Sequence, residues 1–211
     1  MESALYPGAY DPDLKLIETL LWDGARFPRL PLHAARMAQS AETLGWPFDL
    51  AGFRKALEAR PDAPARVRVT ANRAGEIVAE FHPLPARAQE WRIAVCPVRL
   101  RSDDPWLALK TTRRQVYDRA RATMPLGIDE LLFVNEKGQV CEGTITNIFY
   151  DRGRGLRTPP RASGLLPGVL RESLACPEEV LLFTDLPMVK LWVGNALRGL
   201  IPAVWTGQTA A

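Results

Sequence analysis

The feature that most constrains the fold is the alternation of two hydrophobic periods along the chain. Residues 66–70 read Arg-Val-Arg-Val-Thr, the period-two pattern of a strand with one buried face. From Leu32 to Leu44 the apolar residues instead recur at helical spacing, and Gly45 then supplies a stop signal. The sequence contains no internal repeat or low-complexity tract. It therefore predicts a mixed α+β protein with mixed sheets and flanking helices.

A polar stretch near the middle of the chain predicts two lobes. Residues 99–105 read Arg-Leu-Arg-Ser-Asp-Asp-Pro, a composition typical of a linker. We expect an N-terminal α+β lobe at residues 1–98, a linker at 99–104 and a C-terminal lobe at 105–211. The 211 residues suffice for two such lobes with a sizeable core.

Turn residues and apolar spacing also predict the main elements. We expect three hairpins, which place strands on either side of Asp23-Gly24, at 66–70 with 76–81, and at 131–134 with 139–141. We expect four helices, at 32–44, 53–59, 110–121 and 169–175. The last helix follows a glycine-flanked loop at 164–168.

Composition excludes several classes of protein. The net charge is only +3 and the arginines are scattered, which argues against nucleic-acid binding. Three cysteines without a CxxC pair and two histidines indicate neither a disulfide framework nor a zinc site. There is no apolar run of 18 residues, and Met1 to Ala4 show no start of a secretory signal, so we expect a cytoplasmic protein without membrane contact.

Lys110 is one of only five lysines, beside 22 arginines. It precedes Arg113 and Arg114, and nearby cations lower the pKa of an amine. Such an amine can act as a nucleophile that forms a Schiff base at neutral pH. The alternative is an ordinary solvated lysine.

Glu142 stands as a lone carboxylate between hydrophobic strand positions. A buried carboxylate is costly unless a cation meets it. One such cation is the protonated pyridine nitrogen of pyridoxal 5'-phosphate (PLP), which acts as an electron sink in that state. The alternative is a hairpin carboxylate that faces water.

Three further features suit anions. The loop that opens the predicted helix at Val169 resembles the helix N-termini that bind phosphate. Arg36 can hold a phosphate with its guanidinium fork. Arg66 and Arg68 share one face of a strand, and one or both can meet a substrate carboxylate. Solvated charges are the alternative for all three arginines.

In their order and spacing these residues resemble the class IV aminotransferase family of fold-type-IV PLP enzymes, and most of all its 4-amino-4-deoxychorismate lyase branch. The resemblance covers nearly the whole chain. The stretches that carry it are Leu16–Thr19, His33–Met37, Lys110–Arg114, Asp129–Phe133, Asn135–Phe149, Thr158–Pro160, Gly164–Arg171 and Gly194–Gly199.

The resemblance implies roles for four charged residues. Lys110 matches the catalytic lysine that holds PLP as an internal aldimine and later moves the proton. Glu142 matches the carboxylate that keeps the pyridine nitrogen protonated, and Arg36 matches the arginine on the cofactor phosphate. Arg68 matches a strand position that can contact a substrate carboxylate.

The resemblance also implies five further cofactor-binding residues. Val169 and Leu170 match the two residues whose backbone N–H groups bind the phosphate. Asn195 falls where the family has a small polar phosphate ligand. Thr146 and Asn147 follow Glu142 and are expected to line the cofactor pocket.

Two features of the sequence depart from the family pattern. The family tyrosine near the 3'-oxygen of PLP often lies five residues after the lysine, where this chain has Gln115, and Tyr117 follows at seven. Position 170 is leucine where branched-chain aminotransferases have threonine. The first departure argues against a branched-chain aminotransferase and leaves the partner of the 3'-oxygen open, and the second leaves only the backbone N–H of Leu170 as a donor.

The resemblance therefore implies a two-lobed PLP enzyme, similar in fold to D-amino acid and branched-chain aminotransferases, that acts on a small-molecule amine as a homodimer. The expected reaction is that of the lyase branch, which releases pyruvate and 4-aminobenzoate for folate biosynthesis. The alternatives are an aminotransferase for branched-chain or D-amino acids and a non-catalytic homologue that binds PLP.

Overall fold

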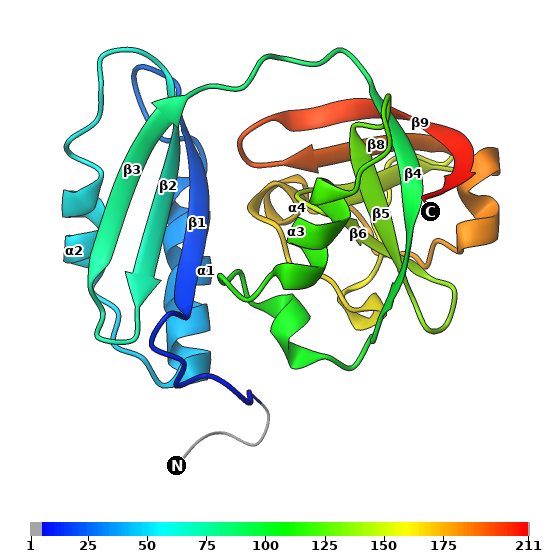
Figure 1. Ribbon diagram of the computed structural model, residues 1–211. Helices are drawn as coiled ribbons and strands as arrows, with labels where there is room; N and C mark the ends of the chain where they lie inside the picture. Colours follow the sequence, from blue (N-terminus) through cyan, green and yellow to red (C-terminus); the bar gives the residue numbers. More distant parts are fainter. Residues whose placement is uncertain (1–5, 211) are drawn as a thin grey trace. The chain divides into compact units, whose positions relative to one another are not determined.

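A three-stranded antiparallel sheet organises the first part of the chain, in the computed structural model that describes residues 6–210 (Figure 1). Its strands are β1 (Lys15–Trp22), β2 (Ala65–Asn72) and β3 (Ile77–Pro83), with β2 in the middle. Helices α1 (Leu30–Leu44) and α2 (Leu50–Ala56) pack on β1 and β3. The alternation in β2 buries Val67 and Val69 completely and leaves Arg66 and Arg68 half-buried on the opposite face.

Local signals explain where the two helices begin and end. Gly45 ends α1 in a left-handed conformation at φ 68°, and its N–H bonds to the carbonyl oxygens at the end of the helix. The Asp49 side chain caps α2 by accepting bonds from the N–H groups of Ala51 and Gly52.

The predicted hairpin around Asp23-Gly24 is wrong. The Asp23 side chain accepts bonds from the N–H groups of Ala25 and Arg26, which makes a turn that leads toward α1. Strand β1 pairs instead with β2, from Lys15 opposite Asn72 to Trp22 opposite Ala65. A strand partner more than 40 residues away leaves no trace in local turn signals.

A six-stranded closed barrel forms the rest of the protein. Its strands are β4 (Trp91–Leu100), β5 (Glu130–Asn135), β6 (Val140–Gly143), β7 (Asn147–Asp151), β8 (Lys190–Asn195) and β9 (Gly199–Thr209). Strand β4 runs parallel to β5 and β9, and the other neighbours are antiparallel. Helices α3 (Gln115–Ala122) and α4 (Val169–Leu174) accompany the barrel, with short 3-10 turns at Pro105–Ala108, Arg161–Ser163 and Phe183–Met188.

The chain forms two compact units, which differ from the predicted lobes. The first unit contains the described chain up to Ala86 together with Leu109–Arg113, and the second contains Arg87–Ala108 and the chain from Arg114 onward. The division thus precedes β4, because that strand finds both its partners in the barrel. The polar residues 99–104, the predicted linker, lie where β4 ends within the second unit.

The segment that carries Lys110 is extended, so the prediction of a helix from residue 110 is wrong at its start. The Ile17 N–H donates to the Lys110 carbonyl oxygen at 2.8 Å, and the Thr112 N–H donates to the Lys15 carbonyl oxygen at 2.9 Å. Since this backbone pairs with the edge of β1, helix α3 begins only at Gln115.

None of the helices between residues 6 and 210 has the length and apolar character that a membrane crossing requires. The same residues contain no group of three or more side chains suited to hold a metal ion. Residues 1–5, which include the Met1 to Ala4 segment used for the expected location, lie outside the described residues.

Candidate active site

Three consecutive residues of β1 position the three predicted site residues of the first unit. Ile17 bonds through its backbone to Lys110, which is half-buried. Glu18 binds the side chain of Arg36 on α1, and Thr19 stands opposite Arg68 on β2. Because successive side chains of a strand point to opposite faces, Glu18 lies on the helix-covered face and Thr19 on the other.

Glu18 is a buried anion with two cationic or polar neighbours. Its side chain is 1% exposed, and Arg36 donates to both of its oxygens, from Nε and Nη2, at 2.7 Å each. His33 Nδ1 donates to Oε2 at 2.6 Å. Burial opposes ionisation, but the Arg36 charge and the bonds from His33 and Arg36 outweigh it and lower the pKa of Glu18 to about 2. Glu18 therefore fixes one edge of the Arg36 guanidinium.

In the second unit, Glu142 lies on β6 with 5% of its surface exposed. The Tyr117 hydroxyl on α3 donates to its Oε1 at 2.7 Å, and the Leu166 N–H donates to its Oε2 at 3.1 Å. These two bonds fix the plane of the carboxylate. The predicted buried carboxylate is thus present, and it does not face water.

Tyr117 is well suited to hold Glu142 as a permanent hydrogen-bond donor. Its ring packs edge-on against Phe133, with the centroids 5.0 Å apart. Burial, then the charge of Glu142, raises the pKa of Tyr117 well above its usual range. The hydroxyl therefore keeps its proton. Gln115, the position at which the family often has tyrosine, is exposed.

A second buried carboxylate, Glu130 on β5, holds the turn after Glu142. It accepts bonds from the N–H groups of Thr144 and Ile145 and from the hydroxyls of Thr144 and Thr146. Burial raises the pKa of Glu130, although these bonds act in the opposite direction. The Thr146 hydroxyl is thus directed to Glu130, so any contact of Thr146 with a cofactor stays a prediction.

Asn147 secures the loop that leads into α4. It stands opposite Glu142 in the β6–β7 pair, and its Nδ2 donates to the Leu166 carbonyl oxygen at 2.8 Å. A Cβ atom added to Gly168 would lie 1.9 Å from Asn147 Oδ1, so only glycine fits there. Helix α4 then begins at Val169 without a side-chain cap. Val169 and Leu170 are buried, and the first N–H groups of a helix have no acceptor within it.

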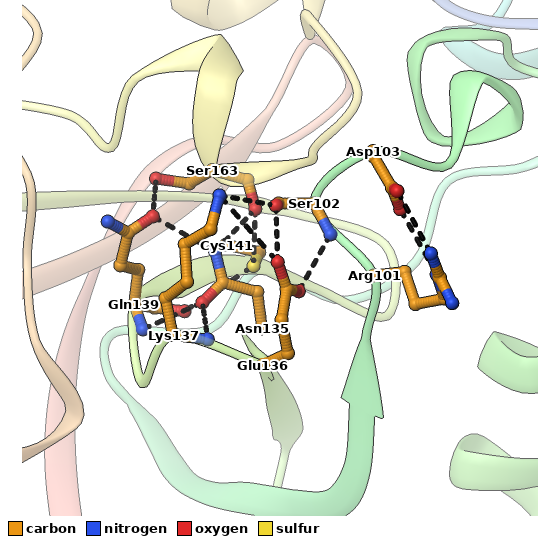
Figure 2. A network of polar contacts seen from close by, with 9 residues as sticks. All are labelled: Arg101, Ser102, Asp103, Asn135, Glu136, Lys137, Gln139, Cys141 and Ser163. Carbon is orange, nitrogen blue, oxygen red and sulfur yellow. Dashed lines mark hydrogen bonds and ion pairs between the residues drawn. The ribbon is translucent and has the colours of Figure 1, made fainter.

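A polar network also fixes Ser163, at the end of the turn that precedes this loop (Figure 2). Asn135 Nδ2 donates to Gln139 Oε1 at 3.0 Å and to the Ser163 carbonyl oxygen at 2.9 Å, and the Ser163 hydroxyl donates to Gln139 Oε1 at 3.0 Å. Cys141 lies against the same Ser163 carbonyl, and burial is the main cause that raises its pKa to about 12. This thiol is therefore a structural group and no nucleophile.

Asn195 closes the β8–β9 hairpin. Its Oδ1 accepts bonds from the N–H groups of Leu197 and Arg198, and its Nδ2 donates to the Ile145 carbonyl oxygen at 3.1 Å. The side chain thus connects the hairpin turn to the turn held by Glu130. Its predicted contact with a phosphate stays a prediction.

The structure therefore brings the predicted residues together in two groups. The first unit holds Lys110, Arg36 and Arg68, all placed by β1. The second unit holds the group formed by Glu142, Thr146, Asn147, Val169, Leu170 and Asn195.

Comparison with known proteins identifies the family of this chain. The family model described as amino-transferase class IV matches residues 15–204. The chain belongs to the class IV aminotransferase family. Its members are PLP-dependent enzymes, lyases or aminotransferases, and this chain is such an enzyme with PLP as its cofactor.

Individual relatives carry names from both branches. A protein of Schizosaccharomyces pombe, provisionally named an aminodeoxychorismate lyase, is 33% identical over 168 residues, 75% of this chain and 72% of that protein. A protein of Thermotoga maritima, provisionally named a branched-chain-amino-acid aminotransferase, is 31% identical over 67% of this chain and 55% of its own length. A crystal structure from Mesorhizobium loti, provisionally named an amino-acid aminotransferase, is 39% identical, with a TM-score of 0.85 over 92% of this chain and all of that one.

The residues present fit PLP. The cofactor has an aldehyde, a pyridine nitrogen and a phosphate, and the chain offers a lysine, a buried carboxylate and an arginine for them. The tight approach of Gly168 to Asn147 leaves the start of α4 without a capping side chain, as a site for an anion requires.

Three residues that shape this site escape prediction as site residues from the sequence. Glu18, Tyr117 and Glu130 do not carry the family's named roles, yet they hold Arg36, Glu142 and the turn at Thr144. A signal for two of them is available. Glu18 is a lone carboxylate among apolar strand residues, like Glu142, and Glu130 directly precedes the apolar run from Leu131 to Val134.

Proposed function

We propose that this chain is a PLP-dependent lyase of the 4-amino-4-deoxychorismate type, which releases pyruvate and 4-aminobenzoate. The observation that carries the PLP chemistry of this proposal is the buried Glu142 carboxylate, which Tyr117 and Leu166 hold in the manner that a protonated pyridine nitrogen needs. The lyase branch is favoured by the relative at 33% identity and by the exposed Gln115, since the tyrosine of many aminotransferases is absent there.

The proposal gives each residue a task. The Lys110 amine binds the cofactor aldehyde and moves a proton, and the Glu142 carboxylate keeps the pyridine nitrogen charged. Arg36 and the N–H groups of Val169 and Leu170 bind the phosphate. When bound, PLP supplies an electron sink for the carbon that carries the substrate amine.

The atoms of this reaction balance without another reactant. Lys110 takes the proton from the ring carbon that bears the amine. The bond between the ring and the enolpyruvyl oxygen then breaks, and the ring becomes aromatic. The enolpyruvate leaves and becomes pyruvate when its methylene carbon gains a proton. Aromatisation makes the step favourable.

A second candidate is an aminotransferase, in which the proton returns to the cofactor and a keto acid is released. It is favoured by the relatives from Thermotoga maritima and Mesorhizobium loti. A third candidate, a non-catalytic homologue, has no physical need for a buried Glu142.

One experiment separates these candidates. The pure holoenzyme is incubated with aminodeoxychorismate and, separately, with L- and D-amino acids plus 2-oxoglutarate. We expect pyruvate and 4-aminobenzoate from the first reaction. Formation of the keto acid of the added amino acid, in the second reaction alone, would establish the aminotransferase, and no product from either reaction would contradict both of these candidates.

The matched variants are Lys110→Ala and Lys55→Ala. We expect the first to lower the rate by at least about a thousandfold, because it removes both a covalent and a proton-transfer group. Lys55 is exposed on α2, so its variant serves as the control. Borohydride reduction with PLP and peptide mapping should place the label on Lys110, and a label elsewhere would contradict the assignment.

The family resemblance also supports a proposal for the location and the assembly of the protein. We propose a cytoplasmic homodimer that acts on a small-molecule amine in folate biosynthesis. Light scattering on the purified holoenzyme measures its mass, for which a single chain is 23.5 kDa. A monomer that is fully active would contradict the homodimer.

A further inference from the structure

Tyr117 connects helix α3 to the buried carboxylate of Glu142 on β6. Its hydroxyl donates to Glu142 Oε1 at 2.7 Å, and the Leu166 N–H donates to Oε2 at 3.1 Å. Both donors are neutral, so they stabilise the charge of the carboxylate without cancelling it. Hydrogen bonds donated to a charged group are the strong ones, and they favour its ionised form. Two separate segments of the second unit therefore support Glu142 as an anion.

The ring of Tyr117 is fixed from two sides. It packs against the core cluster that contains Phe133, with the two ring centroids 5.0 Å apart. The guanidinium of Arg114 lies over the same ring, 5.7 Å from its centroid. Arg114 is itself held by Asp118 Oδ1 at 2.8 Å and by the Thr144 carbonyl oxygen at 3.1 Å. The hydroxyl of Tyr117 thus has a defined position opposite Glu142.

The single proton of this hydroxyl is committed to Glu142. Burial, then the Glu142 charge, raises the pKa of Tyr117 well above its usual range; Cys141 acts in the same direction and Arg114 in the opposite one. A tyrosine has one O–H, so a hydroxyl that donates to Glu142 cannot also donate to the 3'-oxygen of PLP. Tyr117 therefore does not take the place of the family tyrosine five residues after the lysine.

A buried carboxylate next to a pyridinium raises the question of where their shared proton lies. Transfer of the proton from the nitrogen to the carboxylate gives two neutral groups, and burial favours this form because charged groups are costly away from water. Donors to the carboxylate act in the opposite direction, because they stabilise the anion. PLP is a strong electron sink only while its nitrogen is protonated. The donors to the carboxylate thus decide how well this pair works.

We propose that Tyr117 is a positioning residue that keeps the proton of this pair on the pyridine nitrogen, because its hydrogen bond stabilises Glu142 as an anion. The Leu166 N–H acts in the same sense on the other oxygen. The inference rests on the proposed function, since it takes Glu142 as the partner of the nitrogen, but it holds equally for a lyase and for an aminotransferase.

The test compares Tyr117→Phe with a matched control, Tyr150→Phe. Tyr117→Phe keeps the ring and its packing and removes only the hydroxyl. Tyr150, on β7 of the same unit, also donates its hydroxyl at 2.7 Å, but to the Glu179 carbonyl oxygen. The two variants therefore lose the same group, and only the first loses a bond to Glu142. Glu142→Gln is included to test the assignment of the carboxylate itself.

The first readout is the protonation of the cofactor nitrogen. Holoenzyme is prepared with PLP that carries 15N in the ring, and its 15N NMR signal is followed as a function of pH, because the chemical shift differs between protonated and neutral pyridine. We expect the midpoint of this titration to lie at least about one pH unit lower in Tyr117→Phe than in wild type, which is a tenfold change in the equilibrium. Tyr150→Phe should titrate like wild type.

The second readout is the affinity of the apoprotein for PLP and for 1-deaza-PLP, in which a C–H group replaces the ring nitrogen. Fluorescence titration measures both. Tyr117→Phe should reduce the preference of wild type for PLP by at least about tenfold, because a bond to a charged group is lost. Its affinity for 1-deaza-PLP should change by less than about threefold. An equal loss for both compounds would show that Tyr117 serves only the fold, and would overturn the inference.

The outcomes separate this inference from the proposed function. If Glu142→Gln lowers the titration midpoint and Tyr117→Phe does not, the inference fails and the role of Glu142 stands. If Glu142→Gln also leaves the midpoint unchanged, Glu142 is not the partner of the nitrogen and both fail. If wild type has no lyase activity but Tyr117→Phe changes both readouts, the lyase reaction fails and the inference stands.

Tyr117→Met provides a second variant without the hydroxyl. Its flexible side chain fills the space of the ring, so it tests the same bond if Tyr117→Phe fails to fold. We expect the same lower midpoint and the same loss of preference for PLP over 1-deaza-PLP. A midpoint and a preference equal to those of wild type in this variant would overturn the inference.

Discussion

The two faces of the β1–β3 sheet use arginine in opposite ways. On the helix-covered face, Arg36 is clamped by the buried Glu18, which also binds His33. On the opposite, open face, Glu80 stands across from Arg68 on β3, but within residues 6–210 neither Arg66 nor Arg68 makes an ion pair or hydrogen bond with a carboxylate. An arginine with an internal partner has a fixed position, whereas an arginine without one is not held by the fold. The sheet thus has a fixed arginine, Arg36, on one face and two arginines without a described ion pair, Arg66 and Arg68, on the other.

The strongest test of this contrast removes the internal partner. Glu18→Ala leaves Arg36 and His33 buried beside an empty space, so we expect a loss of about 3–5 kcal/mol in the free energy of unfolding. Urea unfolding of the purified protein measures it. Glu42→Ala, at an exposed position of α1, is the control. A loss below about 1 kcal/mol would show that the clamp is not needed for the fold.

Acid should weaken the covered face selectively. The pKa of Glu18 is about 2, below its usual value of 4.5, so the unfolded chain takes up this proton first as the pH falls. The stabilisation is complete above about pH 5 and disappears as the pH falls toward 2, with a total of roughly 3 kcal/mol. Urea unfolding at several pH values should show this loss in wild type and not in Glu18→Gln. Equal pH dependence in both proteins would contradict the assignment.

The Glu18–Arg36 pair should also affect the affinity for the cofactor. Arg36→Lys keeps the charge but loses the fork that Glu18 orients, so we expect PLP to bind about 10- to 100-fold more weakly. Pyridoxal, which lacks the phosphate, should bind both proteins equally. Fluorescence titration of the apoprotein measures both affinities. An equal loss for pyridoxal would show that Arg36 acts on the fold rather than on the phosphate.

The smallest effect is expected on the open face. Arg66→Leu removes a buried donor without an acceptor, so the free energy of unfolding should change by no more than about 0.5 kcal/mol or rise. The same urea experiment measures it, in the absence of any ligand. A loss above about 2 kcal/mol would reveal that Arg66 has a structural role like that of Arg36.

Prediction from the sequence succeeded where the information is local. The alternation of Val67 and Val69 with arginines predicts β2 and its buried face, and Gly45 marks the end of α1 correctly. The family was also predicted correctly, since its motifs lie in order along the chain. The roles of the individual site residues stay predictions.

Prediction failed where a distant partner decides the structure. The segment of Lys110 has helical propensity, but its backbone bonds to β1, nearly a hundred residues earlier. Strand β4 belongs to the barrel for the same reason, since it pairs with β9 at the other end of the chain. The role of Glu18 likewise depends on α1, because His33 and Arg36 of that helix are its partners. Such long-range pairings follow from the fold as a whole.

Ile17, Glu18 and Thr19 contact Lys110, Arg36 and Arg68 in turn, so β1 can pair with its neighbours in one register only. A deletion of one residue ahead of them would turn every side chain of the strand over. The acid would then face the arginine pair on the open side and neutralise it, while the threonine would enter the helix-covered core and leave Arg36 unclamped. Lineages of this protein should therefore tolerate changes of length in the turn after Trp22 far more readily than within this strand.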